Sequence, residues 1–296
     1  MGTMDKARML IIGARGFLGM HASRAAADAF EVFRGSRDAE ADPRSVQIDI
    51  TEASSVNAAF RDVRPDVVML LAALSDIDQC QAQPDLAFFV NVRGPEHVAN
   101  ACASANARLI FTSSAAVFDG RKHGYTEDNP TTPLSIYGET KARAEAAVLG
   151  LVPSAIVLRI ALVLGFAGRA GTNSVLDNWL AQWTSGHPVA SPTFEYRNPI
   201  DAITLSRLMF QLLCSKDARG IFHAGSTDSI SRYELSMKVA RRMGYATLVL
   251  PQTQPKPGRA PRGQDHFLLT DKIGAVCGLP IPSCDEVIMR CVNEAA

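Results

Sequence analysis

The stretch that decides the fold is Arg8-Met-Leu-Ile-Ile-Gly13-Ala-Arg-Gly16-Phe-Leu-Gly19. Its apolar first half predicts a buried strand, and the alanine-rich residues that follow, 17–29, have helical character. The three glycines suit a tight turn, close approach of the backbone to a pyrophosphate and packing of the helix on the sheet. A helix that begins there presents free amide groups and a positive dipole end to phosphate. The order of strand, glycine loop and helix therefore predicts a dinucleotide-binding site.

Short apolar runs alternate with amphipathic segments through the rest of the first half. This alternation predicts an α/β fold, a Rossmann-type doubly wound parallel sheet with a smaller C-terminal substrate domain. The expected strands are residues 8–13, 31–34, 46–49, 66–73, 108–113 and 155–159, and the expected helices are 17–29, 54–63, 84–103 and 135–149.

The pattern is looser after residue 165. We expect a flexible loop (168–172), a helix (173–185), an irregular stretch (188–199), a helix (203–213), a strand (221–224), a helix (232–243), a proline-rich loop (251–261) and a final helix (284–293). Residues 1–165 are expected to form the dinucleotide-binding Rossmann domain, to which 198–224 return. Residues 166–197 and 225–296 are expected to form the substrate-binding domain.

Charge and cysteine content exclude several function classes. Among 296 residues, 30 basic side chains balance 30 acidic ones, so we expect no general electrostatic binding to nucleic acid or to an anionic membrane. The early apolar run 9–12 is far too short for a signal peptide or a membrane span. Six scattered cysteines without C-x-x-C pairs or zinc-ligand spacing predict reduced thiols, a cytoplasmic location and no metal site.

The residues after the second expected strand bear on the choice of cofactor. An acid at this strand end would bind the ribose of NAD, whereas an arginine accommodates the 2′-phosphate of NADP. The chain has Arg34, Ser36 and Arg37 there, and Arg15 of the glycine loop can reach the same phosphate. A solvated basic turn is the alternative, but the convergence of donors favours NADP(H) over NAD(H). Asp49 is placed to meet the adenine or, equally, to cap the next helix.

Three polar side chains form the candidate catalytic group. Tyr137 and Lys141 are four residues apart, which on a helix puts a phenol and an ammonium on one face. The cation is expected to lower the pKa of Tyr137, which could then exchange a proton with a carbonyl oxygen, and Lys141 could also hold the nicotinamide ribose. Ser114 ends a strand, where catalytic groups of doubly wound sheets collect, and can donate a hydrogen bond to a developing alkoxide. Taken singly, these residues are more often a helix surface pair and a strand-end serine.

Together with the glycine loop, Ser114, Tyr137 and Lys141 resemble the extended short-chain dehydrogenase/reductase family. Further segments are similar to its dTDP-4-dehydrorhamnose reductase branch: Pro65-Asp-Val-Val, Asn91-Val-Arg-Gly-Pro95, Val117-Phe-Asp-Gly120, Tyr125-Thr-Glu-Asp128 and Pro133-Leu-Ser-Ile-Tyr137-Gly. The resemblance implies NAD(P)H-dependent reduction of a 4-keto-6-deoxy sugar carried on a nucleotide. It implies that Tyr137 is the acid, Lys141 its partner and Ser114 the hydroxyl that binds the carbonyl. Cofactor contacts are implied at Gly13, Arg15, Gly16, Phe17, Leu18, Gly19, Ile50, Ala72, Ala73 and Asn91.

The chain departs from the family in the substrate pocket. Ala115 and Ala116 stand where the family usually has a carboxylate and an aromatic ring, which removes a polar contact and a ring platform. Arg197 and Arg262 are expected to hold the substrate diphosphate, with solvated arginines as the alternative. Asp76 and Asp78 are expected to cap their loop.

Two alternatives stay open. One is a sugar-nucleotide epimerase of the same fold; a dehydratase ranks lower, because Ala115 and Ala116 lack the carboxylate that many dehydratases have there. The other is a non-catalytic NADP-binding regulatory subunit, similar to the methionine adenosyltransferase β subunit. The resemblance also implies a possible homodimer.

Overall fold

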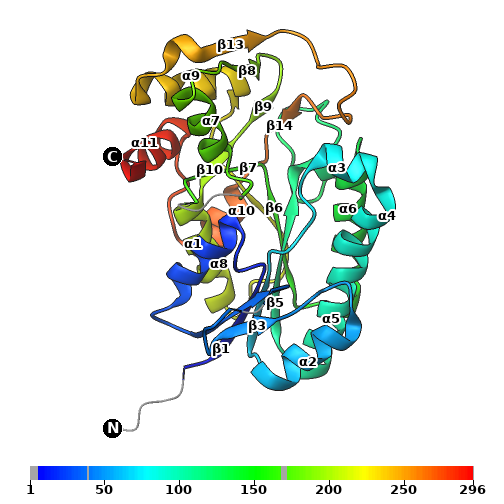
Figure 1. Ribbon diagram of the computed structural model, residues 1–296. Helices are drawn as coiled ribbons and strands as arrows, with labels where there is room; N and C mark the ends of the chain where they lie inside the picture. Colours follow the sequence, from blue (N-terminus) through cyan, green and yellow to red (C-terminus); the bar gives the residue numbers. More distant parts are fainter. Residues whose placement is uncertain (1–5, 39, 168–171, 296) are drawn as a thin grey trace.

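The computed structural model describes residues 6–38, 40–167 and 172–295. Seven parallel strands form its central sheet in the order β11–β6–β5–β4–β1–β2–β3 (Figure 1). Their bounds are β1 Arg8–Ile12, β2 Glu31–Ser36, β3 Ser45–Gln47, β4 Val67–Leu70, β5 Arg108–Ser114, β6 Ile156–Ile160 and β11 Gly220–Ala224. The chain builds outward from β1 in one direction and then from β4 in the other, so these two neighbours mark the point where the strand order reverses. In such sheets a crevice forms at the carboxyl ends of the strands on either side of this point.

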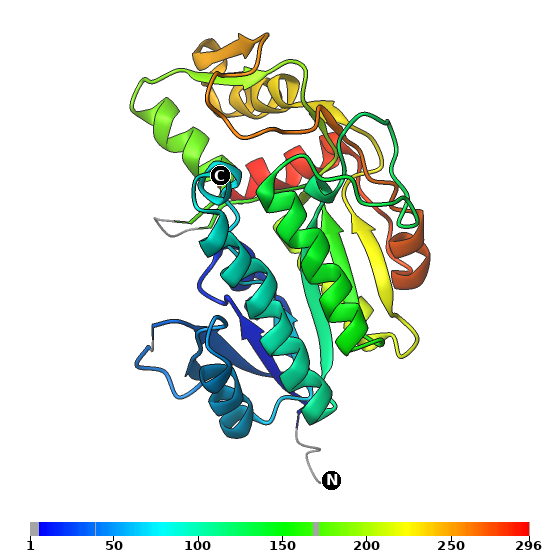
Figure 2. The same ribbon diagram turned by 90° about the vertical axis from the view of Figure 1, so that its right-hand side faces the viewer.

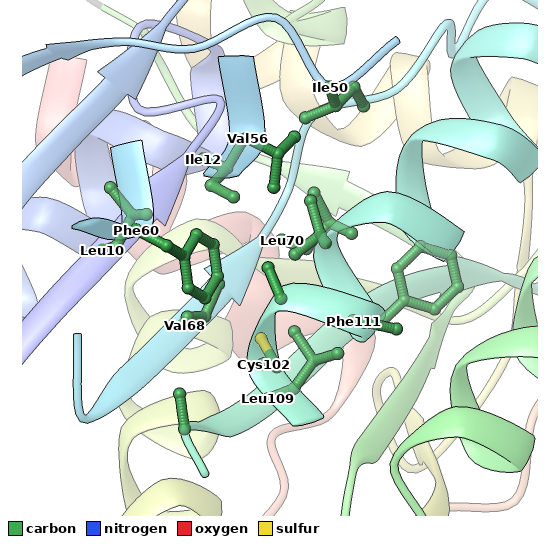
Figure 3. Packing of buried hydrophobic residues seen from close by; sticks show 14 of the residues in the cluster. Leu10, Ile12, Ile50, Val56, Phe60, Val68, Leu70, Cys102, Leu109 and Phe111 are labelled. Carbon is green, nitrogen blue, oxygen red and sulfur yellow. The ribbon is translucent and has the colours of Figure 1, made fainter. Parts of the chain in front are cut away.

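Helices cover both faces of this sheet, which explains why its inner strands are almost wholly apolar. One face is covered by α2 (Ala53–Val63), α5 (Gly94–Ala105) and α6 (Ile136–Leu151), and Figure 2 shows α5 and α6 crossing in front of the strands. The opposite face is covered by α1 (Phe17–Ala26), α8 (Ala202–Cys214) and α10 (Asp271–Cys277). Figure 3 shows the first of these two cores, where Phe60, Leu70 and Phe111 pack between sheet and helices.

The long helix expected at 84–103 is three consecutive helical segments: α4 (Pro84–Phe88), a π-helical turn η1 (Phe89–Arg93) and α5. Pro95 explains the π-turn, because a proline cannot donate to the carbonyl four residues back and its ring collides with that carbonyl. The amide of Gly94 instead donates to the carbonyl of Phe89, five residues back.

A third core lies above the carboxyl ends of the central strands (Figure 1). It is formed by α7 (Val175–Thr184), α9 (Arg232–Met243), α11 (Cys284–Ala295), β8 (Val189–Pro192) and β13 (Val249–Gln252). Trp179 and Trp183 are buried in it. The segment 198–224 supplies helix α8 and strand β11 to the central sheet and its covering helices. Helix α10, from a later part of the chain, packs in the same core. A separate third core supports the division into two domains, whose boundaries stay a prediction.

Two expectations for this region are wrong. Residues 188–199 are not irregular throughout, since they contain β8 and β9 (Tyr196–Arg197), and the proline-rich loop begins inside β13. Strands β8 and β13 pair in parallel although about 60 residues separate them, and such a pairing leaves no local sequence pattern. Most of the expected flexible loop at 168–172 lies outside the described residues, since the structure does not describe residues 168–171.

The remaining short elements are α3 Ile77–Ala82, η2 Ala115–Val117, β7 Leu162–Leu164, β10 Pro199–Asp201, β12 Ile230–Ser231, η3 Ala246–Leu248 and β14 Asp265–His266.

Within the described ranges, no helix combines the length and the apolar character that crossing a bilayer requires. All six cysteines are free thiols.

Candidate active site

A cavity of about 1290 Å³ lies at the carboxyl ends of the central strands and extends to the third core. Its lining includes Ile12, Ser36, Ser114 and Ile160, the last residues of four of these strands. Most of the site residues predicted from the sequence line this one cavity: Gly13, Arg15, Gly16, Phe17, Leu18, Gly19, Ser36, Arg37, Asp49, Ile50, Ala72, Ala73, Ser114, Tyr137, Lys141, Arg197 and Arg262. Arg34 and Asn91 are not among the lining residues.

The glycine loop has the close packing that a dinucleotide cradle requires. Gly13 has a φ of +92°, and a Cβ there would lie 2.7 Å from the amide nitrogen of Ala72. A Cβ on Gly19 would lie 2.2 Å from the carbonyl oxygen of Gly13. Helix α1 begins at Phe17 with no side-chain cap, which leaves its first amides free to bind an anion. Cradle and helix end therefore fit a pyrophosphate.

The adenosine end of the cavity carries charges of both signs. Arg15 forms ion pairs with Asp38 and Glu40, each at 3.1 Å, and Asp38 itself lines the cavity. Arg34 instead pairs with Asp42, away from the lining. The arginines were predicted from the sequence, whereas the acids that pair with them were not.

Asp49 and Asn91 both act on the backbone around the cavity. Asp49 lines the cavity and also accepts hydrogen bonds from the amide and hydroxyl of Thr51, at 2.9 and 2.7 Å, which fixes the turn before α2. Asn91 is buried, accepts from the amide of Leu74 at 2.8 Å and donates to its carbonyl at 3.0 Å. It therefore holds the loop after β4, and direct contact between Asn91 and a cofactor stays a prediction.

Strand β5 and helix α6 bring the catalytic candidates together. Ser114 is the last residue of β5, while Tyr137 and Lys141 lie in the first two turns of α6, whose N-terminus is capped by Ser135 through the amide of Gly138 at 3.2 Å. All three line the same cavity as the glycine loop. The Nζ of Lys141 lies 4.3 Å from the ring centroid of Phe111.

Burial controls the protonation of this group. It lowers the pKa of Lys141 to about 8, against the attraction of Glu145 one helical turn away. It raises the pKa of Tyr137 to about 12, and the Ser114 hydroxyl opposes that rise. The lower pKa expected for Tyr137 is therefore wrong for the protein alone, because removing the phenolate from water outweighs the hydrogen bond with Ser114. A phenol with a raised pKa is held as a proton donor at neutral pH.

A buried ion pair lies close to the candidate catalytic residues. Glu145 of α6 pairs with Arg159 of β6 at 2.7 Å and accepts a hydrogen bond from Ser113 of β5 at 2.5 Å. Both charged side chains are at most 5% exposed. This network joins the strand that ends in Ser114 to the helix that carries Tyr137. No local sequence pattern indicates this network, because its residues are far apart in the chain.

The other end of the cavity is rich in arginine. Arg262 donates to both carboxylate oxygens of Asp78, at 2.9 and 3.0 Å, and this holds the pKa of Asp78 well below its usual range. Asp78 lies in the first turn of α3 and links this helix to the 259–262 segment, so it is not the loop cap expected. Asp76 does cap α3, through the amide of Gln79 at 2.9 Å.

Two further arginines line this end. Arg197 is buried and donates to the carbonyl groups of Tyr196, Gln264 and Gly263. Arg232, which sequence analysis missed, lies over the ring of Trp179 at 5.8 Å and forms no ion pair with any residue that the structure describes. No signal in the sequence distinguishes Arg232 from an exposed helix-start arginine. Among the described residues, no group of three or more His, Cys, Asp or Glu side chains is placed to hold a metal.

A doubly wound sheet, a glycine cradle and a Ser-Tyr-Lys group in one cavity define an extended short-chain dehydrogenase/reductase, a class of NAD(P)-dependent oxidoreductases. The fold and the glycine loop fit a nicotinamide dinucleotide. The family model described as "RmlD substrate binding domain" matches residues 7–296, and the chain belongs to this family.

Curated relatives and solved structures agree with this assignment. The chain is 32% identical over 290 residues to the dTDP-4-dehydrorhamnose reductase of Mycobacterium tuberculosis, covering 92% of this chain and 88% of the relative. It is 29% identical over 265 residues to the methionine adenosyltransferase 2 subunit beta of Xenopus tropicalis, covering 88% and 79%. The dTDP-4-dehydrorhamnose reductase of Bacillus anthracis, solved with NADP, has the same fold, with a TM-score of 0.88, 24% identity and coverage of 98% and 99%.

Proposed function

We propose that this protein is an NADP(H)-dependent reductase of a nucleotide-linked 4-keto-6-deoxy sugar. The observation that carries the proposal is that Ser114, Tyr137 and Lys141 line one cavity with the glycine cradle. A keto group placed between Ser114 and Tyr137 meets two hydroxyl donors next to the expected position of the nicotinamide. The similarity to dTDP-4-dehydrorhamnose reductases supports the substrate class.

Each residue has a separate role in the proposed reaction. The reduced nicotinamide, when bound, supplies the hydride. Ser114 donates a hydrogen bond to the carbonyl oxygen, and Tyr137 donates the proton that this oxygen takes up as it becomes a hydroxyl. The ammonium of Lys141 stabilises the phenolate that Tyr137 leaves behind. The half-buried position of Tyr137 limits the access of water to the proton being transferred.

The arginine-rich end of the cavity is suited to the diphosphate of the nucleotide. Arg232 makes no ion pair within the described chain, so an incoming phosphate gains a cation without displacing a carboxylate. Arg262 is oriented by Asp78 and adds a second cation. Arg197 is held by three carbonyl groups, and its contact with substrate is part of the proposal.

The small side chains at 115 and 116 leave the choice of sugar open. Ala116 lines the cavity and Ala115 is buried beside it, so no carboxylate or ring from this segment restricts the bound sugar. The substrate is therefore sought with a panel of nucleotide 4-keto-6-deoxy sugars that differ in nucleotide and in stereochemistry.

The test follows NADPH and NADH oxidation with this panel, running Tyr137→Phe beside the wild type. We expect the wild type to oxidise NADPH in stoichiometric amounts and Tyr137→Phe to lose at least about a hundredfold in kcat, the usual contribution of a general acid. Equal rates for the two proteins would remove Tyr137 from the mechanism. Conversion of the sugar without net NADPH consumption would indicate the epimerase instead.

The similarity to the methionine adenosyltransferase 2 subunit beta favours one second candidate, a regulatory subunit that binds the dinucleotide without turnover. Size-exclusion chromatography of the purified chain with a methionine adenosyltransferase catalytic subunit tests it. A stable complex, together with no oxidation of NADPH by the whole panel, would replace the reductase by this second function.

The preference for NADP(H) rests on Arg15 and Arg37 at the adenosine end of the cavity. Dissociation constants for the two dinucleotides measure it directly. A cytoplasmic location and a homodimer stay predictions, and light scattering of the purified protein tests the second.

A further inference from the structure

Three carboxylates of the segment after β2 pair with two of the arginines expected to select NADPH, and one of them, Asp38, lines the cavity. Asp38 and Glu40 both contact Arg15, the first through Nη1 and the second through Nε, each at 3.1 Å. Asp42 contacts Arg34. Arg15, one of the arginines expected to meet the 2′-phosphate, is therefore already engaged by two acids of the segment that follows β2.

We propose that Asp38 and Glu40 are specificity-determining residues that occupy Arg15 in place of the 2′-phosphate and so keep the preference for NADPH over NADH small. The inference rests on the proposed function only in that this cavity binds the dinucleotide. It does not depend on the sugar.

The two cofactors make different demands on this ion-pair cluster. A 2′-phosphate carries a charge of about −1.5 to −2 at pH 7, so NADPH must compete with Asp38 and Glu40 for Arg15. Both carboxylates stay near the phosphate as like charges. NADH brings only a hydroxyl group to this position, which leaves both ion pairs intact. The acids therefore weaken NADPH binding and leave NADH binding nearly unchanged.

The size of the effect follows from exposure. The Arg15 side chain is 31% exposed, that of Glu40 40% and that of Asp38 83%. Such solvent-exposed pairs are weak, so neutralising both acids should lower the dissociation constant of NADPH by about two- to tenfold. The dissociation constant of NADH should stay within about twofold, because exposed substitutions that break no contact with a ligand change little.

The experiment titrates NADPH and NADH into the purified full-length chain without any sugar and follows the nicotinamide fluorescence at fixed low ionic strength. The test variant is the double substitution Asp38→Asn with Glu40→Gln. The matched control is Asp42→Asn, since its partner Arg34 does not line the cavity. We expect tighter NADPH binding in the test variant alone.

Three results would overturn the inference. One is unchanged or weaker NADPH binding in the test variant. Another is weaker NADH binding in that variant, which would make Asp38 a ligand of the ribose hydroxyl. The third is an undiminished gain in an Arg15→Gln background, because general charge and not the release of Arg15 would then cause it. A wild type that binds neither dinucleotide would overturn the proposed function as well, whereas normal binding without these shifts overturns only the inference.

Discussion

Replacing Lys141 by methionine should make the protein more stable while removing its activity. Lys141 is only 2% exposed, and burial lowers its pKa from 10.5 to about 8. At 1.36 kcal/mol per pKa unit, this difference corresponds to about 3 kcal/mol of destabilisation whenever the buried amine is charged. Methionine keeps most of the apolar stem and carries no charge.

One favourable contact offsets part of this cost. The ammonium lies 4.3 Å from the centroid of the Phe111 ring, and such a cation–π contact contributes about 1 kcal/mol. The net gain for Lys141→Met at pH 7 is therefore about 2 kcal/mol, which for a chain of this size raises Tm by about 4 °C.

The sign of the pH dependence follows from the direction of the shift. Below pH 8 the lysine is protonated in both the folded and the unfolded protein, so the full cost is present. Between pH 8 and 10.5 the folded protein loses the proton first, and the wild type gains stability as pH rises. The gap between variant and wild type is thus largest at neutral pH and closes toward pH 10.5.

The assay is thermal unfolding followed by circular dichroism at pH 7 and pH 9.5. Lys238→Met is the matched control, because Lys238 is 39% exposed and pairs with Asp285 on the surface. We expect the control to change Tm by no more than about 1 °C at either pH. A Lys141→Met protein that is less stable than the wild type at pH 7, or a gap that does not change with pH, would refute the reasoning.

Two further predictions concern the buried ion pair and the glycine loop. Glu145→Ala leaves Arg159 charged and unpaired in the interior, so the free energy of unfolding should fall by about 3–5 kcal/mol in denaturant titrations. Adding Arg159→Met should restore most of this loss, and a double variant as unstable as the single one would contradict the assignment of the cost to the unpaired charge. Gly19→Ala places a Cβ 2.2 Å from the carbonyl oxygen of Gly13, so NADPH should bind at least about tenfold more weakly in fluorescence titrations. Wild-type affinity in that variant would show that the loop can widen without loss of the cradle.

Much of the fold could be predicted because its signals are local. Apolar runs predicted the inner strands to within a few residues, and the glycine loop predicted the start of α1. The long helix was found but not its π-turn, because the effect of Pro95 on the carbonyl of Asn91 depends on how the helix continues on both sides. The short parallel strands β8 and β13 could not be predicted, since each is defined only by its distant partner.

Most of the candidate site residues predicted from the sequence line one cavity, whereas the electrostatics of the site were predicted less well. Spacing alone placed Tyr137 and Lys141 on one helical face, and the strand end placed Ser114 beside them. The direction of the Tyr137 pKa was wrong, because the expected lowering assumed a neighbouring charge and took no account of burial. Asp78 was read as a local cap, although its main partner, Arg262, is 184 residues away.

The sequence by itself determined the class of fold, the glycine loop that follows the first strand, and the choice of Ser114, Tyr137 and Lys141 as candidate catalytic residues, because each depends on periodicity, on local spacing or on the end of a strand. The tertiary structure alone decided which arginines line the cavity and which form ion pairs with carboxylates. Among the described residues Arg232 forms no ion pair, Arg34 pairs with Asp42, and Arg15 pairs with both Asp38 and Glu40. It also decided the protonation of Lys141. Ion pairing and desolvation depend on which groups are brought together in space, and these contacts form only when distant segments of the chain pack around one cavity.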